Sequence, residues 1–188
     1  GLVETIPRKG AVVKTFSTTD IGNYFEARTM IECFVAHLAV QNVDKFPETA
    51  VFTLECATHS RCEMRDITAE VRSFVRRMAV ERGWRYGALT LFCPHTTCGL
   101  TLNEGADPDV RRDMLAFFSR LAPEAGDYRH AEGNSDAHIK TTLHGSSLLL
   151  LVEEGELCLG TWQAVYLCEG DGPRRRNLWL QWLPGARE

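Results

Sequence analysis

The sequence predicts an α+β domain with a mainly antiparallel β-sheet core and a few packed helices, preceded by an N-terminal extension. Segments with the composition of strands outnumber segments with helical periodicity, and only a few of them follow a βαβ order. The clear signals begin at residue 50. We therefore expect an extension over residues 1–49 and a single domain over residues 50–188 of this 188-residue chain.

The composition is that of a globular protein, and it argues against two classes of partner. Hydrophobic residues make up 44% and charged residues 24% of the chain, and the net charge is −4. A protein that binds mainly nucleic acid is usually basic, because phosphate neutralisation supplies most of that affinity. The uncharged apolar runs, such as residues 147–152, are far shorter than the roughly 20 residues that a membrane span requires. We expect neither nucleic acid nor membrane as a partner.

Seven cysteines are present, and none of them forms a C-x-x-C pair. This spacing does not match a zinc ribbon or a thioredoxin motif. Residues 1–10 contain no apolar stretch as long as that of a signal peptide. We therefore expect reduced thiols, no structural disulfide and a cytoplasmic location.

The first 49 residues predict one strand and one helix, and they contain no candidate functional site. Residues 10–16 have the pattern of a short strand, and residues 27–43 have apolar side chains at helical spacing until Pro47 interrupts the chain. No polar groups gather near a turn in this segment. It is an accessory segment, a leader or an oligomer contact, and the sequence alone does not choose among these.

The first half of the domain predicts three strands and one helix. Residues 51–56, 88–93 and 99–102 have the composition of strands, and residues 88–93 form a continuous apolar run typical of a buried strand. A helix is expected with Asp66 or Thr68 as its N-cap and Gly83 at its end. Its inward face is expected to contain Val71, Phe74, Val75 and Met78.

The second half predicts two helices and three strands. The first helix has Asp107 as its N-cap and Pro108 at its first position, and Pro123 ends it. Its apolar stripe comprises Val110, Met114, Phe117, Phe118 and Leu121. After a polar loop over residues 122–137, a short helix is expected from Asp136 to Gly145, with Ile139 and Leu143 facing the core. The three strands are expected at residues 147–152, 157–168 and 177–183, with a Glu154-Gly155 turn between the first two.

The strongest cluster of chemically capable side chains lies at residues 94–104. It contains His95, Thr96, Thr97, Asn103 and Glu104, around a strand that begins and ends in polar residues. The last two precede a helix start, where free backbone N–H groups bind phosphate or carboxylate. In the alternative interpretation, the threonines only satisfy a turn and Asn103 and Glu104 cap the helix.

A second cluster contains His130, His138 and Lys140, near Tyr128 and Asp136. Together with His95, the histidines can bind a divalent metal, bind a diphosphate or transfer protons. The spacing does not distinguish these roles, because His130 and His138 lie eight residues apart, unlike the i,i+4 pair of a helical metal site.

A third cluster contains Trp162 and Gln163, followed by an arginine run over residues 174–176. Arginine forks match phosphate oxygens, so Arg174 is a candidate anion ligand, whereas Arg175 fits a solvated loop tip. Cys93 and Cys98 flank a histidine, but the apolar run before Cys93 favours a buried, inert thiol over a nucleophile.

These motifs resemble those of the YjbQ family over about residues 50–183. The matching segments, in the family's order and at about its spacing, are His95-Thr-Thr-x-x-Leu-Thr-Leu-Asn-Glu104, Asp107-Pro108 with Asp113, Tyr128-x-His130, His138-Ile-Lys140, Gly160-Thr-Trp-Gln163 and Gly172-x-Arg174-x-Arg176. The resemblance implies a strand-rich α+β fold and a homotrimer with sites near subunit contacts. It also implies secondary thiamine-phosphate synthase activity, which joins a pyrimidine methyl diphosphate to a thiazole phosphate and releases pyrophosphate. Cys98 departs from the family, which usually has a small residue such as alanine at this position.

From the motifs and this resemblance we predict three sets of site residues. The catalytic set is His95, Asn103, Glu104, His130 and His138. The substrate-binding set is Thr96, Thr97, Lys140, Trp162, Gln163 and Arg174. A divalent metal, Mg²⁺ by expectation, has His95, His130 and His138 as candidate ligands, and the expected partner is a small phosphorylated metabolite. The alternatives are a metal-dependent hydrolase or lyase that uses the same histidines, and a non-catalytic trimer that binds an anionic metabolite.

Overall fold

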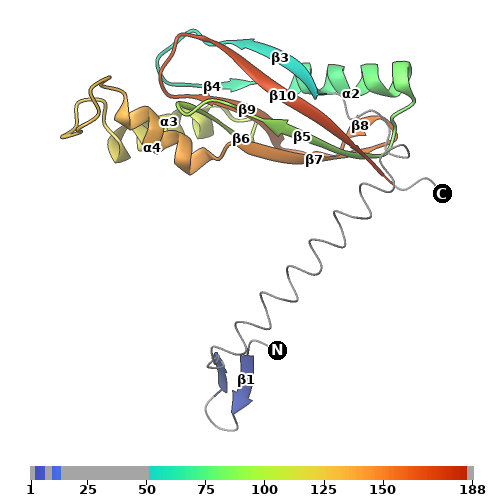
Figure 1. The fold of residues 1–188 in the computed structure, drawn as a ribbon, viewed down its shortest axis with the longest axis horizontal. Coiled ribbons are helices and arrows are strands. Elements are labelled where there is room, and N and C mark those ends of the chain that lie inside the picture. Colours follow the sequence, from blue (N-terminus) through green and yellow to red (C-terminus); the bar gives the residue numbers. More distant parts are fainter. Residues whose placement is uncertain (1–2, 7–9, 14–50, 186–188) are drawn as a thin grey trace, which may run out of the picture. The chain divides into compact units, whose positions relative to one another are not determined.

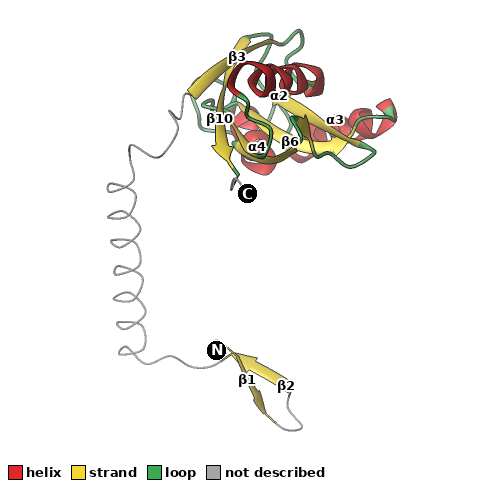
Figure 2. Cartoon of the chain, turned by 90° about the vertical axis from the view of Figure 1, so that its right-hand side faces the viewer, coloured by secondary structure: helices red, strands yellow, loops and turns green. Residues whose placement is uncertain are grey.

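The computed structural model of the chain describes residues 3–6, 10–13 and 51–185, which fall into two units, Gly1–Glu48 and Thr49–Glu188. In the first unit, β1 (Val3–Ile6) and β2 (Gly10–Val13) pair as an antiparallel hairpin (Figure 2). The strand predicted from residue 10 is therefore present as far as Val13. The helix predicted over residues 27–43 lies outside the described residues.

The second unit contains two antiparallel sheets (Figure 1). The five-stranded sheet has, in spatial order, β3 (Val51–Ala57), β10 (Arg175–Pro184), β5 (Gly87–Phe92), β7 (Ser147–Glu153) and β8 (Glu156–Leu157). The three-stranded sheet has β4 (Glu63–Asp66), β9 (Gln163–Glu169) and β6 (Cys98–Glu104). All the strand pairs run antiparallel, so the predicted α+β class with an antiparallel core is confirmed.

Three helices accompany these sheets: α2 (Thr68–Arg82), α3 (Pro108–Leu121) and α4 (Ser135–His144). The predicted ends of α3 and the predicted C-terminal end of α2 are confirmed. The predicted N-cap of α2 is wrong, because Ile67 holds that position without a side-chain cap, and the Asp66 carboxylate, one residue earlier, accepts the Thr68 N–H. Gly83 ends α2 with φ of 68°, a left-handed conformation that glycine adopts without strain. Asp107 caps α3 by accepting the Asp109 N–H at 2.8 Å. None of these helices is long and apolar enough to cross a membrane.

The main core lies between the two sheets and α2. Alternate residues of β5, β7 and β10 point into it, as the period of two in a strand requires. The predicted inward face of α2 is confirmed, because Val71, Phe74, Val75 and Met78 are all buried there. Leu100, Val165 and Leu167 of the three-stranded sheet complete this core.

The opposite face of the three-stranded sheet packs against α3. Ala164, Tyr166 and Cys168 alternate with the core residues of β9 and contact Met114 and Leu115 of α3. Strand β9 is therefore buried on both faces from Ala164 to Glu169. The α3 helix itself has no buried residue, and the side chains of Phe117 and Leu121 in its apolar stripe remain exposed.

The prediction for the inward face of α4 is wrong. Ile139 and Leu143 are exposed, whereas Asp136, Ala137 and Lys140 are buried. Burial of a carboxylate and an ammonium group is tolerated here because they pair with each other at 2.8 Å, and Arg61 also pairs with Asp136. The partner that neutralises this helix face comes from a distant segment, which periodicity does not reveal.

The single strand predicted over residues 157–168 is also wrong. The segment forms β8 and β9, which belong to different sheets and are separated by residues 158–162. The expected turn before it is present, with Glu154 and Gly155 both at positive φ between β7 and β8.

Candidate functional site

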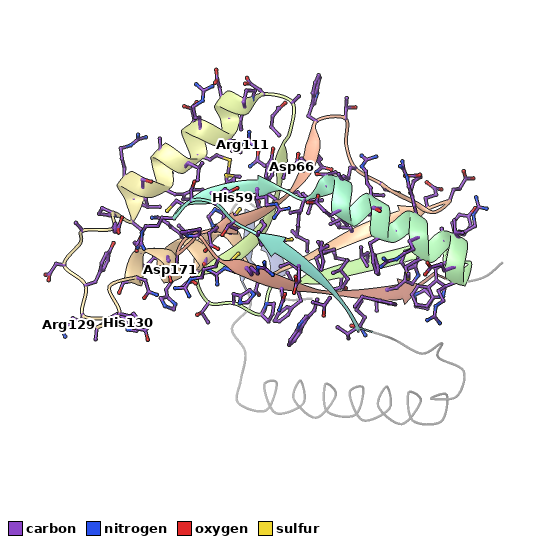
Figure 3. All side chains as sticks on the ribbon, turned by 90° about the horizontal axis from the view of Figure 1, so that it is seen from above. His59, Asp66, Arg111, Arg129, His130 and Asp171 are labelled. Atoms are coloured by element: carbon purple, nitrogen blue, oxygen red, sulfur yellow. The ribbon has the colours of Figure 1, made fainter. Side chains whose placement is uncertain are left out.

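Three segments that are distant in sequence meet at one end of the domain. The loop before β6 approaches the loop between β9 and β10, where the Gly170 N–H donates to the Thr97 carbonyl at 3.0 Å. The start of α4 joins them, because the Asn134 amide donates to Asp171 at 3.1 Å. Figure 3 shows Asp171, Arg129 and His130 towards this same end. The site is therefore assembled from loops held by the buried strand β9.

A buried ion pair between Glu169 and Arg176 lies beneath these loops. The Arg176 Nε donates to Glu169 at 2.7 Å, and its Nη2 also donates to the Thr97 hydroxyl at 3.0 Å. Thr58 and the Gly170 and Asp171 backbone amides donate to the same carboxylate. Burial opposes ionisation of Glu169, but the hydrogen bonds from Arg176 and the backbone outweigh it and lower its pKa. Both groups are therefore charged at neutral pH.

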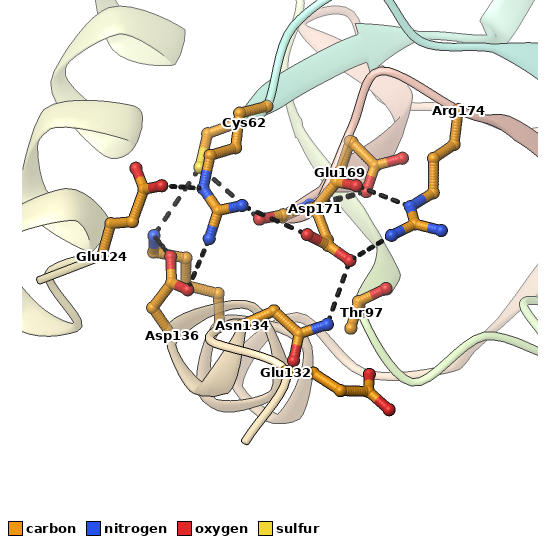
Figure 4. Close-up of polar contacts among 12 residues, drawn as sticks. Cys62, Thr97, Glu124, Glu132, Asn134, Asp136, Glu169, Asp171 and Arg174 are labelled. Carbon is orange, nitrogen blue, oxygen red and sulfur yellow. Dashed lines mark hydrogen bonds and ion pairs between the residues drawn. The ribbon is translucent and has the colours of Figure 1, made fainter. Parts of the chain in front are cut away.

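Asp171 connects the surface loops to the interior of the site (Figure 4). Its carboxylate accepts from Arg61 at 3.2 Å, from Asn134 at 3.1 Å and from Arg174 at 2.6 Å. Burial opposes ionisation, but the hydrogen bond from Asn134 and the charge of Arg174 lower the pKa of Asp171. The Asp171 carboxylate thus holds Arg174, which the sequence predicts as a candidate anion ligand.

Asp136 is the second carboxylate that joins the segments. It accepts from Arg61 at 2.9 Å and from Lys140 at 2.8 Å. Only 6% of Lys140 is exposed, and its ammonium group contacts Asp136 and, at 3.6 Å, the Cys62 sulfur. Lys140, which the sequence predicts to bind substrate, therefore lies beneath the surface, within the network of ion pairs among Arg61, Asp136 and Asp171.

The sequence around β9 and β10 explains why this loop takes its shape. The segment Glu169-Gly170-Asp171-Gly172 alternates carboxylates with glycines. A Cβ atom on Gly172 would lie 2.3 Å from the Ser60 carbonyl oxygen, so only glycine allows the loop to approach the segment before β4 this closely. That approach brings Arg61 within reach of Asp171.

His95 and Thr96 lie at the edge of this network. The His95 Nε2 accepts the Asn177 N–H at 3.1 Å, a geometry that requires an unprotonated nitrogen. Burial and the nearby Arg176 charge both lower the pKa of His95. Thr96 is exposed and Thr97 is buried, so only the first of the two hydroxyl residues faces solvent.

His130 and His138 form a neighbouring pair. Their ring centroids lie 5.4 Å apart, and the Nε2 of His130 is 3.7 Å from the exposed Glu132 carboxylate. In the described part of one chain, no three histidine, cysteine, aspartate or glutamate side chains converge as metal ligands. The three candidate histidines therefore do not fit a metal site within one chain, and the divalent metal stays a prediction.

The remaining predicted site residues lie at the opposite end of β6 and β9. Asn103 pairs with Ala164, and Glu104 pairs with Gln163, whereas Cys98 pairs with Glu169 at the first end. The Asn103 side chain contacts the Met114 sulfur and accepts the Glu104 N–H, and Gln163 accepts the Gly160 N–H. Within one chain, the predicted site residues are thus divided into two groups.

The group at the first end has the chemistry of an anion site. Four cationic side chains meet three buried carboxylates there, namely Arg61, Lys140, Arg174 and Arg176 against Asp136, Glu169 and Asp171. Arg174 is the most accessible of the four, with 54% of its side chain exposed. Its Nε donates to the Asp171 carbonyl and its Nη2 to the Asp171 carboxylate, so the guanidinium is held in place, and Nη1 makes no hydrogen bond within the described residues.

The sequence analysis did not assign five residues to the site: Arg61, Asp136, Glu169, Asp171 and Arg176. A signal was present for four of them: Glu169 and Asp171 alternate with glycines directly before the arginine run, Arg176 ends that run, and Asp136 stands in the cluster with His138 and Lys140. Arg61 carried no signal, because it stands in a polar segment without a motif. Its role depends on contacts with residues 75 and 110 positions away.

The six cysteines within the described residues are free thiols. Cys98 is fully buried, and the hydrogen bond with Cys93 together with burial strongly raises its pKa. The departure from the family's usual small residue therefore places an inert thiol beneath the site.

Comparison with known proteins identifies relatives of the domain. The family model described as "UPF0047 protein YjbQ-like" matches residues 52–185. The UPF0047 protein YugU of Bacillus subtilis is 47% identical over 132 residues, which cover 70% of this chain and 97% of that protein. A UPF0047 protein of Methanocaldococcus jannaschii is 40% identical and covers 70% of this chain and 92% of its own length.

Solved structures show the same relationship. A YjbQ/UPF0047 family protein from Clostridium acetobutylicum has a TM-score of 0.66 and 45% identity, covering 70% of this chain and 99% of its own. A YbjQ-like protein of unknown function from Sulfolobus solfataricus has a TM-score of 0.67 and 27% identity, covering 73% and 99%. None of these four names states a reaction.

Proposed function

Because the chain belongs to the UPF0047 YjbQ-like family, and because its cationic motif residues meet at one end of the domain, we propose that it is a transferase of the secondary thiamine-phosphate synthase type. The thiazole nitrogen of a thiazole phosphate attacks the methylene carbon of a pyrimidine methyl diphosphate. A C–N bond forms, the C–O bond to the diphosphate breaks, and thiamine phosphate and pyrophosphate leave. The substrate is thus a small phosphorylated metabolite, as the sequence analysis expected.

The observation that carries the proposal is the fixed, half-exposed guanidinium of Arg174. Negative charge builds up on the diphosphate as the C–O bond breaks, and preorganised donors at that position lower the barrier. Arg174 is such a donor, because Asp171 holds two of its nitrogens while more than half of its side chain is exposed. A guanidinium held in this way loses little side-chain entropy when it binds phosphate oxygens.

The histidines supply the remaining polar surface in this proposal. His95 is neutral at neutral pH, since its pKa is lowered, and it is held by the Asn177 N–H. His130 is exposed and His138 is partly exposed beside it, so both are available to diphosphate oxygens. A bound divalent ion would shield the diphosphate charge.

The test is formation of thiamine phosphate from the two precursors in the presence of Mg²⁺. Arg174→Gln removes the fixed guanidinium, and loss of one such donor lowers kcat by roughly 100-fold or more. Arg175→Gln is the matched control, because Arg175 is the exposed neighbouring arginine, at the first residue of β10. Activity that is equal in the two variants would contradict the proposed role of Arg174.

Two further outcomes would redirect the proposal. If the folded wild-type protein forms no thiamine phosphate, calorimetric titration with pyrophosphate reports whether the site still binds the anion. Binding without product would favour the non-catalytic anion-binding alternative. Metal that remains after dialysis and is lost from the His130→Ala variant would favour the hydrolase or lyase alternative.

A further inference from the structure

We infer that Cys62 and Lys140 form an oxidative modification site. A small peroxide oxidises the Cys62 thiol, and the Lys140 amine then captures the oxidised sulfur in an S–N bond that thiols reverse. The consequence of this bond for catalysis rests on the proposed function. The bond itself is tested without any assay of activity.

The first observation is a direct contact between an amine and a thiol. The Lys140 Nζ donates to the Cys62 Sγ at 3.6 Å, and Figure 4 includes the Cys62 sulfur beside the ion pairs of the site. Only 6% of Lys140 is exposed, so the surrounding protein holds the amine against the sulfur. Asp136 fixes its position further by accepting another N–H at 2.8 Å. The two atoms that would react are therefore already neighbours in the fold.

The second observation is the type of residue at position 140. Lys140 is the only lysine in residues 50–188, where all the other lysine-or-arginine positions are arginines. Arginine suits a buried ion pair and stays protonated, whereas a lysine amine can lose its proton and act as a nucleophile. A domain that otherwise uses arginine therefore has its one lysine amine in contact with a thiol.

The third observation is that a small oxidant has access to this sulfur. A cleft of about 310 Å³ lies between α3, α4 and β4, and its lining includes Cys62, Lys140, His144 and Phe118. Cys62 is partly exposed, whereas four of the other five described cysteines are buried. Oxidation of a thiol depends on its exposure, so a peroxide in solvent reaches Cys62 before it reaches the buried thiols.

His144 provides a free hydrogen-bond acceptor on the lining of the cleft. Its Nδ1 lies 2.7 Å from the Lys140 carbonyl oxygen, which only accepts, so Nδ1 carries the proton. Burial lowers the pKa of His144, so the ring is neutral and its Nε2 has a lone pair. No described residue donates to this Nε2. A peroxide O–H group that enters the cleft gains a hydrogen bond there.

The reaction balances with one molecule of hydrogen peroxide. The Cys62 sulfur attacks one peroxide oxygen and the O–O bond breaks, which gives a sulfenic acid and water. The Lys140 ammonium passes a proton to the Asp136 carboxylate, and the free amine attacks the sulfur. The S–N bond forms as the S–O bond breaks, and the hydroxide leaves as water with a second proton from the nitrogen. The sulfur is oxidised and the peroxide is reduced, and torsions along the lysine stem supply the roughly 2 Å of approach.

The bond changes the charge balance of the candidate site. Lys140 loses its positive charge, so the ion pair that it makes with the fully buried Asp136 is lost. Asp136 also pairs with Arg61, which in turn pairs with Asp171, the residue that holds Arg174. A change at Lys140 therefore reaches the guanidinium that the proposed function requires. Under that proposal, the oxidised protein is expected to form thiamine phosphate more slowly and to recover after reduction.

Peptide mass spectrometry of the full chain tests the bond directly. The folded protein is treated with hydrogen peroxide, the remaining thiols are blocked, and the digest is searched for a peptide that joins residues 62 and 140. Its expected mass is about 2 Da below the sum of the two peptides, because the S–N bond replaces two hydrogen atoms. Dithiothreitol is expected to separate them again.

Two variants and one internal control make the result specific. Cys62→Ser removes the sulfur, and Lys140→Arg preserves the charge but removes the amine nucleophile, so neither is expected to give the joined peptide. Cys158 is exposed, and it is expected to be oxidised without joining to residue 140.

The outcomes separate the bond from the proposed reaction. A wild-type protein in which Cys62 is oxidised or stays reduced, without the joined peptide, overturns the inference whatever the activity. A joined peptide in a protein that forms no thiamine phosphate supports the modification site and refutes the proposed reaction. If peroxide inactivates Cys62→Ser as fully as the wild type, the link between the bond and the candidate site is refuted.

Discussion

Substitution of Glu169 by glutamine tests whether the buried ion pair with Arg176 maintains the fold around the site. Glutamine preserves the size and one carbonyl acceptor but removes the negative charge. Only 5% of Arg176 is exposed, so water does not replace the lost charge. In the variant the guanidinium keeps the Thr97 hydroxyl as a neutral acceptor but has no carboxylate partner. Removing one partner of a buried pair costs about 3–5 kcal/mol. At about 2–4 °C per kcal/mol, Tm is expected to fall by roughly 10 °C.

The assay is thermal and urea-induced unfolding at pH 7, followed by circular dichroism. Wild type and variants are compared at one protein concentration, because association also changes apparent stability. The double variant Glu169→Gln/Arg176→Met removes both charges and is expected to regain much of the lost free energy of unfolding, because no charge is left unpaired. If Glu169→Gln loses less than about 1 kcal/mol, or if the double variant is no more stable than Glu169→Gln, the reasoning is refuted.

Three further predictions concern stability and reactivity. Asp107→Ala removes the carboxylate that accepts the Asp109 N–H, and urea unfolding is expected to show a loss of about 1 kcal/mol; an unchanged midpoint would contradict the cap. Cys98 is expected to resist iodoacetamide in the native protein and to react only after unfolding, which peptide mass spectrometry reads directly; native labelling would show that its burial is incomplete. The pKa values of Glu169 and Asp171 are lowered by folding, so the folded state binds fewer protons than the unfolded state in acid. The two carboxylates therefore stabilise the fold fully above the ordinary carboxyl pKa, and this stabilisation is lost as the pH falls through their lowered pKa values. Urea unfolding from pH 6 to pH 3 measures the loss. A free energy of unfolding that does not fall over this range would contradict the lowered pKa values.

The elements whose signals are local could be predicted from the sequence. The glycine that ends α2 and the N-cap of α3 depend on residues within one helical turn, and the inward face of α2 follows from one apolar period. The strand β3 and the hairpin turn at Glu154 and Gly155 were identified for the same reason. For these elements, neighbouring residues contain all the information that the fold uses.

The rest of the fold depends on pairings between distant residues. The α4 helix turns Asp136 and Lys140 inward because Arg61, far away in sequence, neutralises them. A rule that places apolar residues inside assigned Ile139 and Leu143 to the wrong face. Strands β8 and β9 follow one another with little polar interruption, so their separation into two sheets is decided by their partners, β7 and β6.

The exposed motif residues of the candidate site could be predicted from the sequence, whereas the buried carboxylates that hold them in place could not. His95, Thr96 and Arg174 stand in recognisable motifs, and the loop before β6 and the loop between β9 and β10 that contain them meet at one end of the domain. The carboxylates that hold them are single residues in polar loops, where an aspartate is usually solvated. The division of the motif residues between the two ends of β6 is a property of the strand length, which single motifs do not express.

Strand β9 restricts how the length of this chain can change during evolution. An insertion or deletion within Gln163–Glu169 would shift every following side chain to the opposite face of the sheet. Because both faces are buried, neither register leaves a tolerant side, and the main core and the α3 contact would be disrupted together. We therefore expect the number of residues in β9 to stay constant among relatives.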